Sequence, residues 1–269
     1  MWQAEWVQRK LNQINIPTEI IPISSEGDLN LKQPIYQLGI TGVFTRSLDI
    51  ALLNNQIDIA VHSLKDAPTL LPGGIELKGF MKRGNHKDIL VYKSDEIFQK
   101  NKRTIATGSL RRTSFWLNKF PQDSLVDLRG NVQLRIQKLM DSDWDGAIFA
   151  YAGLDRSEIL NELSEKNLKF TTLDWMTSAP SQGIVGITCR PEFEMPPISD
   201  ENSKIAATIE RQFLNVLEGG CTAPIGAFSN VSDEMIEFKG SILSLDGKKM
   251  ISIEEVFSIS EYENKGKAL

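Results

Sequence analysis

The sequence predicts an α/β protein that ends in a small α+β module. Over the first three-quarters of the chain, short apolar runs alternate with amphipathic segments, which is the pattern of a parallel α/β fold. Residues 190–200 then contain three prolines, a composition typical of a linker. After this segment, residues 228–259 alternate between apolar and polar side chains as antiparallel strands do.

The individual elements follow from hydrophobic spacing. Amphipathic helices place apolar residues at i, i+3 and i+4, and buried strands appear as short continuous apolar runs. On this basis we predict helices over residues 2–13, 45–55, 110–119, 131–140 and 155–166. We predict strands over residues 18–23, 57–61, 89–92, 104–107 and 147–150. In the C-terminal module we expect a helix over 201–217 and strands over 237–243 and 250–257, with a turn at Asp246-Gly247.

Length and composition limit the class of protein. The chain has 269 residues, which suits two or three compact domains of about 100 residues each. A hydrophobic fraction of 41% supplies real cores, so intrinsic disorder is excluded as the main state. The 30 Lys and Arg against 35 Asp and Glu give a net charge of −5, which argues against a nucleic-acid binder. No apolar stretch approaches the roughly 20 residues that span a bilayer, so we expect no membrane partner.

Cysteine usage and the N-terminal residues indicate the compartment. Two cysteines cannot build a disulfide framework, and no C-x-x-C zinc pair is present. No basic and apolar secretory signal follows Met1. We therefore expect a cytoplasmic protein. We expect no metal site, because His62 and His86 have no second ligand at metal spacing.

Lys65 and Asp66 follow the predicted strand over 57–61 directly, and ligands of open α/β sheets bind at the carboxyl ends of strands. A cation and a carboxylate there would position a substrate amine and stabilise a developing positive charge. The alternative is a solvated turn before Pro68. Spacing alone does not decide between them.

Arginines are concentrated in the middle of the chain, where six of the eleven lie between Arg103 and Arg156. Ser109 is a predicted helix N-cap, which puts Arg111 and Arg112 in the first turn, where the helix dipole disfavours cations. Their placement is explained if an anion binds at this helix N-terminus.

The same arrangement recurs at Arg129, Asn131 and Arg135, where Asn131 is the predicted N-cap, and Arg156 lies further along. Arginine rather than lysine indicates carboxylate or phosphate recognition. One arginine-rich helix start could arise on a surface without a binding function. The repetition of this arrangement favours anion binding. The absence of a G-x-x-x-x-G-K-[ST] loop argues against a nucleoside triphosphate.

Cys221 follows the C-terminal end of the helix predicted over 201–217. The dipole at that end disfavours a thiolate, so Cys221 suits permanent attachment of a group better than rapid nucleophilic turnover. An inert loop cysteine is the alternative. Cys189 lies in an apolar run and is predicted to be strand core.

Five motifs together resemble those of the hydroxymethylbilane synthase family, also called porphobilinogen deaminase. They are D-I-A-V-H-S-L-K-D-A-P (58–68), G-S-L-R-R (108–112), L-R-G-N-V (128–132), A-G-L-D-R (152–156) and L-E-G-G-C (217–221). They occur in the family's order and spacing, and the similarity runs from Trp2 to the last residue.

The resemblance implies two domains like type II periplasmic binding proteins, with the active site in the cleft between them, and a small third domain. The first would comprise residues 1–84 and 178–195, the second 85–177 and the third 196–269. The enzyme would be a monomeric transferase of tetrapyrrole (haem) biosynthesis. It would deaminate porphobilinogen, join four units to a dipyrromethane cofactor and release hydroxymethylbilane by hydrolysis.

The resemblance also implies residue roles. Asp66 matches the catalytic aspartate, Lys65 a neighbouring cofactor contact, and Cys221 the attachment point of dipyrromethane. Binders of the acetate and propionate groups of substrate, cofactor and polypyrrole intermediates are expected at Arg111, Arg112, Arg129, Arg135 and Arg156. Supporting polar contacts are expected from Ser63, Thr107, Ser109 and Asn131.

The chain departs from the family pattern at three places. Relatives begin with a strand and loop reading roughly I-G-T-R-x-S-x-L-A before the W-Q-A helix, so this chain is expected to lack the first strand. It is also expected to lack most of the last helix. Thr41 stands where many relatives have lysine, and Arg46 is a candidate substitute. Two alternatives to the enzyme therefore remain: a truncated, non-catalytic fragment, and a two-lobed carboxylate-binding module.

Overall fold

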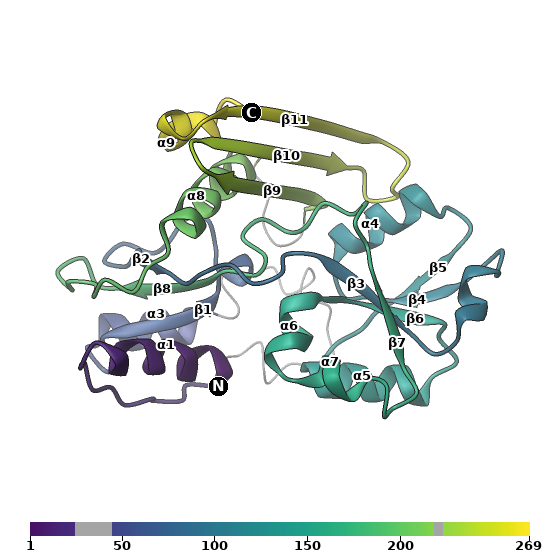
Figure 1. Ribbon diagram of the computed structural model, residues 1–269, viewed down its shortest axis with the longest axis horizontal. Coiled ribbons are helices and arrows are strands. Elements are labelled where there is room, and N and C mark those ends of the chain that lie inside the picture. The colour runs from purple at the N-terminus through teal and green to yellow at the C-terminus, as the bar shows by residue number, and fades with distance from the viewer. Residues whose placement is uncertain (25–44, 218–222) are drawn as a thin grey trace.

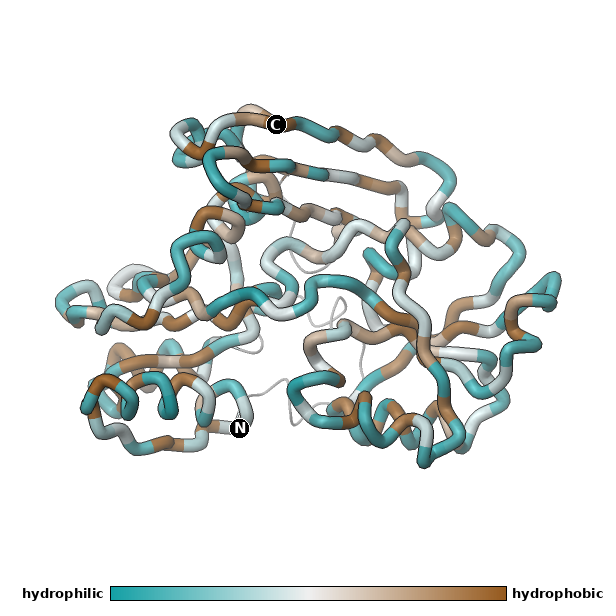
Figure 2. The backbone as a smooth tube through the Cα atoms, viewed as in Figure 1, coloured by the Kyte–Doolittle hydropathy of each residue, from teal (hydrophilic) through white to brown (hydrophobic). Residues whose placement is uncertain are grey.

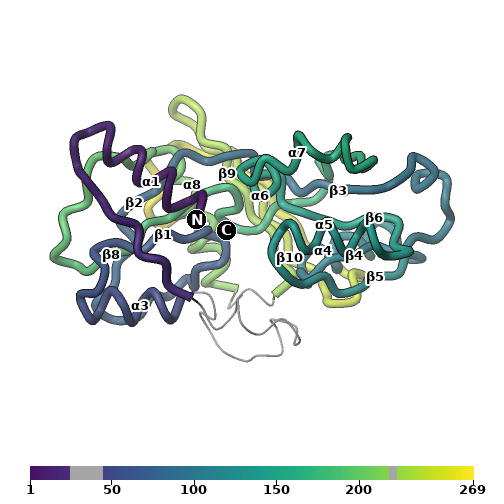
Figure 3. Tube along the Cα trace, turned by 90° about the horizontal axis from the view of Figure 1, so that it is seen from below, coloured from purple at the N-terminus to yellow at the C-terminus, as the bar shows by residue number. Residues whose placement is uncertain are grey.

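The computed structural model describes residues 1–24, 45–217 and 223–269, and within them the strands form three sheets. Two sheets belong to α/β lobes that lie side by side, and the third belongs to a C-terminal α+β domain that lies across both (Figure 1). The view from below shows the same side-by-side arrangement of the two lobes (Figure 3). The predicted fold class, two α/β lobes with a small C-terminal α+β domain, is confirmed. The domain boundaries at residues 84, 177 and 195 stay predictions.

Lobe 1 is built on a three-stranded sheet of order β1-β8-β2. Its elements are α1 (Trp2–Gln13), α3 (Arg46–Leu53), β1 (Ile59–Ser63), the 3-10 turn η2 (Leu64–Asp66), β2 (Glu76–Phe80) and β8 (Val185–Cys189). Helix α1 buries Val7 and Leu11 against Val185 and Ile187 of β8. Helix α3 covers the sheet through Leu52, which packs with Ala60 and Ile75.

Lobe 2 contains a five-stranded mixed sheet of order β5-β4-β6-β3-β7. Its strands are β3 (Asp88–Tyr92), β4 (Thr104–Ala106), β5 (Ser124–Val126), β6 (Gly146–Ala150) and β7 (Lys169–Thr172). Its helices are η3 (Asp95–Phe98), α4 (Leu110–Lys119), α5 (Val132–Asp141), α6 (Tyr151–Arg156) and α7 (Ile159–Glu162).

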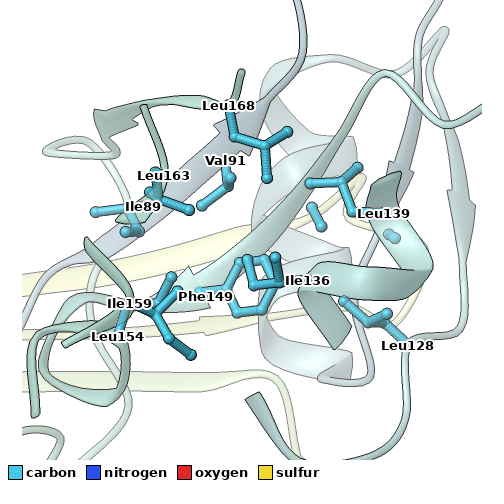
Figure 4. Packing of buried hydrophobic residues seen from close by; sticks show 12 residues of the cluster. Ile89, Val91, Leu128, Ile136, Leu139, Phe149, Leu154, Ile159, Leu163 and Leu168 are labelled. Atoms are coloured by element: carbon cyan, nitrogen blue, oxygen red, sulfur yellow. The ribbon is translucent and has the colours of Figure 1, made fainter. Parts of the chain in front are cut away.

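One of the two buried clusters of lobe 2 lies between the sheet and helices α5 to α7, and the other packs α4 against the sheet. Side chains from β3 and β6, among them Val91 and Phe149, meet Ile136 and Leu154 from the helices (Figure 4). In Figure 2 the hydrophobic stretches follow the strands inside each lobe, whereas the outer helix turns and loops are largely hydrophilic. This distribution is the one that burial of apolar surface produces.

The C-terminal domain packs one helix against an antiparallel sheet of order β11-β10-β9. Its elements are α8 (Glu201–Val216), β9 (Ile225–Ser232), β10 (Met235–Leu243), β11 (Met250–Ser258), η4 (Ile259–Glu261) and α9 (Tyr262–Lys265). Helix α8 reaches lobe 1, where Ala207 packs with Phe80. The β10–β11 turn reaches lobe 2, where Asn118 of α4 donates to the Gly247 carbonyl at 2.7 Å. The domain therefore contacts both lobes.

Two crossover segments join the lobes, residues 81–87 between β2 and β3 and residues 173–184 between β7 and β8. They run close together, since Gly84 donates its N–H to the Gly183 carbonyl at 3.0 Å. Gly183 has φ +89°, and a Cβ there would lie 2.7 Å from the Gly84 carbonyl oxygen. Only glycine satisfies both the left-handed backbone and this close approach.

The structure corrects three predictions. The strand after α3 is not parallel to its neighbour, because β8 returns from lobe 2 and pairs antiparallel with both β1 and β2. Residues 18–23 form no strand and have no sheet partner among the described residues. The helix predicted over 155–166 is two short helices, α6 and α7, separated at Glu158, which has φ +62°.

Candidate functional site

Lys65 and Asp66 lie in the turn η2, which follows β1 directly. The turn is anchored by Leu64, which is 1% exposed and donates its N–H to the Ile184 carbonyl at 3.0 Å. Because Leu64 points into the core of lobe 1, Lys65 and Asp66 are left half-buried beside lobe 2. Ser63, the last residue of β1, is also half-buried.

Asp88, the first residue of β3, is fully buried and binds both arginines of α4. Arg111 Nη2 lies 2.7 Å from Oδ2, and Arg112 Nη2 lies 2.8 Å from Oδ1. Burial raises the pKa of this carboxyl, but Arg111 and Arg112 outweigh burial and hold the pKa of Asp88 well below its usual range. The anion expected at this helix N-terminus is therefore, in part, a carboxylate of the protein itself.

Each of these two arginines also donates to a backbone carbonyl. Arg111 Nη1 donates to the Thr177 carbonyl at 2.7 Å, and Arg112 Nη1 donates to the Ile148 carbonyl at 3.1 Å. Both guanidinium groups are thereby fixed in direction. They supply a rigid positive charge facing the junction between the lobes.

Gln182, which the sequence analysis missed, connects the two lobes at this point. Lys65 Nζ donates to Gln182 Oε1 at 3.3 Å, and Gln182 Nε2 donates to Asp88 Oδ1 at 3.0 Å. Gln182 lies in the second crossover and is 1% exposed. No local pattern marks it, because both partners lie about a hundred residues away in the chain.

Arg135, on α5, lies near the same group of charged residues at the junction of the lobes. Burial lowers the pKa of Arg135, as do the nearby charges of Arg112 and Arg129, while Asp66 and Asp127 act in the opposite sense. Its Nε donates to the Gly130 carbonyl at 2.6 Å. The structure thus brings Asp66 of lobe 1 within electrostatic range of Arg135 of lobe 2.

The two predicted N-caps are confirmed. The Ser109 side chain accepts from the N–H of Arg112 at the start of α4, and the Asn131 side chain accepts from the N–H of Leu134 at the start of α5. Thr107 is buried, and its hydroxyl accepts from the Ser109 N–H at 3.3 Å. In these contacts the side-chain oxygens of Thr107, Ser109 and Asn131 act as acceptors.

Arg156, the last residue of α6, has different contacts. Its guanidinium lies over Trp2 and Trp6 of α1, 5.3 and 5.6 Å from the ring centroids, and Nη2 donates to the Gly183 carbonyl at 2.6 Å. Burial lowers the pKa of Arg156, and Asp155 opposes this. In this structure Arg156 joins lobe 2 to α1 and to the second crossover.

The environment of Lys65 changes the pKa of its amine. Burial lowers its pKa to about 8, with Asp66 and Asp88 raising it and Arg112 and Arg111 lowering it further. Lys65 therefore carries its charge at neutral pH and loses it at mildly alkaline pH.

Cys221 and Thr41 lie outside the described residues, while Arg46 is the first residue of α3.

The charges that meet between the lobes do not balance. Among the described residues that act on Lys65 or Arg135, five cations face three carboxylates: Lys65, Arg111, Arg112, Arg129 and Arg135 against Asp66, Asp88 and Asp127. A surplus of positive charge in a partly buried place is suited to a ligand with several carboxylates. Fold and site thus define a two-lobed α/β protein with a cluster of cations where its lobes meet.

Comparison with known proteins identifies the family. The family profile described as "Porphobilinogen deaminase, dipyromethane cofactor binding domain" matches residues 1–195, and "Porphobilinogen deaminase, C-terminal domain" matches residues 204–269. The chain belongs to the porphobilinogen deaminase family. The predicted family, enzyme class and dipyrromethane cofactor are thereby confirmed, whereas the individual site residues stay predictions.

Curated relatives agree over nearly the whole chain. The porphobilinogen deaminase of Carboxydothermus hydrogenoformans is 37% identical and matches 100% of this chain and 88% of its own. That of Syntrophotalea carbinolica is 32% identical, over 99% of this chain and 86% of its own. That of Desulfitobacterium hafniense is 35% identical, over 94% and 84%.

Two solved structures show weaker similarity. The periplasmic VFT2 domain of Bordetella pertussis BvgS has a TM-score of 0.41 and 12% identity, covering 79% of this chain and 77% of that one. The GluR0 ligand-binding core in complex with L-glutamate has a TM-score of 0.40 and 11% identity, covering 79% and 82%. No helix in the described part of the chain is both long and apolar enough to span a membrane.

Proposed function

We propose that this chain catalyses the hydroxymethylbilane synthase reaction at the junction of its lobes, with Asp66 as the catalytic residue. The reaction joins four porphobilinogen molecules with loss of ammonia and releases hydroxymethylbilane, in tetrapyrrole biosynthesis. One observation carries the assignment of the site. Asp66 of lobe 1 lies within electrostatic range of Arg135 of lobe 2.

Asp66 has the chemistry that deamination of porphobilinogen requires. When the aminomethyl C–N bond breaks, its electron pair leaves with the nitrogen as ammonia and a positive charge spreads over the pyrrole ring. A carboxylate that accepts the pyrrole N–H stabilises this charge as it develops. A hydrogen bond to a charged group contributes about 1.5–3 kcal/mol.

Arg135 is the cation best placed to bind a ligand carboxylate directly. Among the described residues, its two Nη groups donate to no protein atom, whereas its Nε is held by the Gly130 carbonyl. Arg111 and Arg112 are held by Asp88, so their contribution is a fixed positive potential. Arg129 is proposed to add to this potential, and Ser63, Thr107, Ser109 and Asn131 to supply polar contacts.

The residues present fit the dipyrromethane group, whose acetate and propionate carboxylates match the surplus of cations between the lobes. When bound, dipyrromethane supplies the terminal pyrrole carbon to which substrate is added. Lys65 and Arg135 would hold its carboxylates, and Asp66 would meet a pyrrole N–H. We propose Cys221 as the attachment point, because it matches the cysteine of the family motif.

The test is turnover of porphobilinogen, followed as ammonia release. Asp66→Asn keeps the shape of the side chain and removes the charge, and we expect it to lower kcat by about 100-fold or more. Asp95→Asn, which alters an exposed ion pair in lobe 2, is the matched control and should keep wild-type kcat. Near-normal kcat in Asp66→Asn would refute the catalytic role of Asp66. If the wild type binds porphobilinogen without turnover, the chain is a carboxylate-binding module instead of an enzyme.

We further propose that the enzyme is a cytoplasmic monomer without nucleic-acid or membrane partners. The net charge of −5 and the low cysteine content support this proposal. Sedimentation of the full chain should give the mass of one chain. A dimer mass that persists on dilution would contradict it.

A further inference from the structure

We propose that Gln182 is a positioning residue that holds Lys65 against the Asp88–arginine cluster, so that the two lobes present one site. Here the Asp88–arginine cluster means Asp88 with Arg111 and Arg112. The proposal rests on the proposed function, which gives Lys65 a role in the reaction. It adds a residue of the second crossover that acts on the reaction through its contact with Lys65.

Each polar atom of Gln182 has a partner. Oε1 accepts from Lys65, and Nε2 donates both to Asp88 Oδ1 and to the His86 carbonyl, the latter at 2.7 Å. The backbone N–H donates to the Ala179 carbonyl at 2.9 Å. Because Nε2 lies between two acceptors, the orientation of the amide is fixed and Oε1 must face Lys65.

The backbone of Gln182 is held just as firmly. Arg83 Nε donates to the Gln182 carbonyl at 2.9 Å, and the Arg83 guanidinium forms a two-point ion pair with Glu210 of α8, at 2.7 and 3.1 Å. Glu210 also accepts from the Ser181 N–H at 2.6 Å. The C-terminal domain thus fixes the crossover that carries Gln182.

The amide of Gln182 is buried, with 1% of the residue exposed. An apolar side chain of equal length would fill the same space but would leave Asp88 and the His86 carbonyl without this donor. An amide is needed where one group must receive a hydrogen bond from a cation of lobe 1 and donate one to a carboxylate of lobe 2. Gln182 does both.

The hydrogen bond from Lys65 to Gln182 affects the pKa of the Lys65 amine. The groups that face Lys65 are Asp66, Asp88, Arg111 and Arg112, and its amine also donates to Gln182. A hydrogen bond accepted from the ammonium stabilises the charged form. Loss of this acceptor should therefore lower the pKa of Lys65, and replacement by a carboxylate should raise it.

Two variants separate the contacts. Gln182→Met keeps the length of the side chain and removes its hydrogen bonds to both lobes. Gln182→Glu keeps an acceptor for Lys65, loses the donor to Asp88 and adds negative charge. Gln99→Met makes the same chemical change at an exposed site of lobe 2 and serves as the control.

The experiment measures two pH profiles on the full-length variants. The first is the rate at which an amine-specific acylating reagent modifies Lys65, read by peptide mass spectrometry, which needs no turnover. The second is kcat for porphobilinogen. We expect both midpoints to move to lower pH in Gln182→Met and to higher pH in Gln182→Glu, with kcat of Gln182→Met at its optimum reduced about ten-fold. Gln99→Met should match the wild type in both.

The outcomes are distinguishable. Opposite shifts of the Lys65 midpoint in the two variants, followed by kcat, support the proposal. Unchanged modification midpoints in variants that keep a cooperative thermal transition overturn it, whether or not the chain turns over substrate. Shifted modification midpoints with unshifted kcat profiles overturn the role of Lys65 in the reaction, and with it any positioning role of Gln182.

Discussion

Arg112 and Asp88 form a closed ion pair inside lobe 2, with Nε and Nη2 of the arginine at 2.9 and 2.8 Å from the same carboxylate oxygen. Arg111 binds the other oxygen. Two cations in the first turn of α4 oppose the helix dipole, and Asp88 compensates for them from a neighbouring strand. This pairing keeps a concentrated positive potential at the lobe junction at all times, before any ligand binds.

Replacing Asp88 by Asn should strongly destabilise the protein. The substitution leaves two buried guanidinium groups without their counter-charge, and breaking a buried pair costs about 3–5 kcal/mol. Urea unfolding of Asp88→Asn measures the loss. Asp145→Asn, which breaks a partly exposed pair with Lys100, is the comparison and should cost less. Equal losses in the two variants would contradict the account.

Replacing Glu210 by Gln should loosen the C-terminal domain from the crossovers. Glu210 is fully buried and binds Arg83 together with the N–H groups of Ser181 and Ser229. We expect a loss of about 3 kcal/mol in the free energy of unfolding. Glu254→Gln, at an exposed pair with Lys239, should change stability by less than about 1 kcal/mol. A Glu210→Gln variant as stable as Glu254→Gln would refute this role.

His62 should make stability depend on pH between about 4 and 6.5. Burial, and then the charge of Arg211, lower its pKa from 6.5 to about 4, and its Nε2 lies 2.9 Å from the Thr188 hydroxyl. Within this window the unfolded chain binds the proton and the folded chain does not, so the free energy of unfolding falls as pH falls.

The slope attributable to His62 should be at most about 1.4 kcal/mol per pH unit. His62→Gln should remove this part of the slope in urea unfolding measured from pH 7 to pH 4. His86, whose pKa is also lowered to about 4, contributes a separate part that His62→Gln leaves in place. An unchanged slope in His62→Gln would show that His62 is not buried in its neutral form.

Arg135→Gln should weaken substrate recognition without unfolding the protein. Loss of one charge-assisted contact predicts a decrease in kcat/KM for porphobilinogen of about 10- to 100-fold. Arg135→Lys should recover part of this, since it keeps the charge and loses the planar fork. Arg9→Gln, on the exposed side of α1, is the control and should match the wild type. A kcat/KM of Arg135→Gln equal to that of Arg9→Gln would contradict the assignment.

Local patterns were sufficient to predict many of the elements and two helix caps, although the strand expected over 18–23 is absent. The capping roles of Ser109 and Asn131 depend on a few neighbouring residues, and the structure has both. The helix over 110–119 was predicted with the bounds that α4 has. An apolar run such as 57–61 indicates a buried strand, but it does not indicate the direction of the neighbouring strand. The antiparallel pairing of β1 with β8 therefore could not be predicted.

The parts of the site that were missed depend on distant residues. Asp88 was not predicted as part of the site, because its partners Arg111 and Arg112 come from another element. Gln182 gave no signal, since an isolated glutamine has no motif. Arg156 was predicted only as a ligand binder. Its contacts with Trp2 and Trp6 depend on how α6 packs near α1, and the local sequence does not contain this information.

We expect this chain to carry a covalently bound dipyrromethane through Cys221, and the intact mass of the purified protein tests this most directly. We predict a mass above that of the sequence by two linked pyrrole units, with a positive colour test for pyrroles. Cys221→Ser should show the unmodified mass, and Cys189→Ala, at the buried cysteine of β8, should keep the addition. An unmodified wild-type mass, or an addition that persists in Cys221→Ser, would contradict the account.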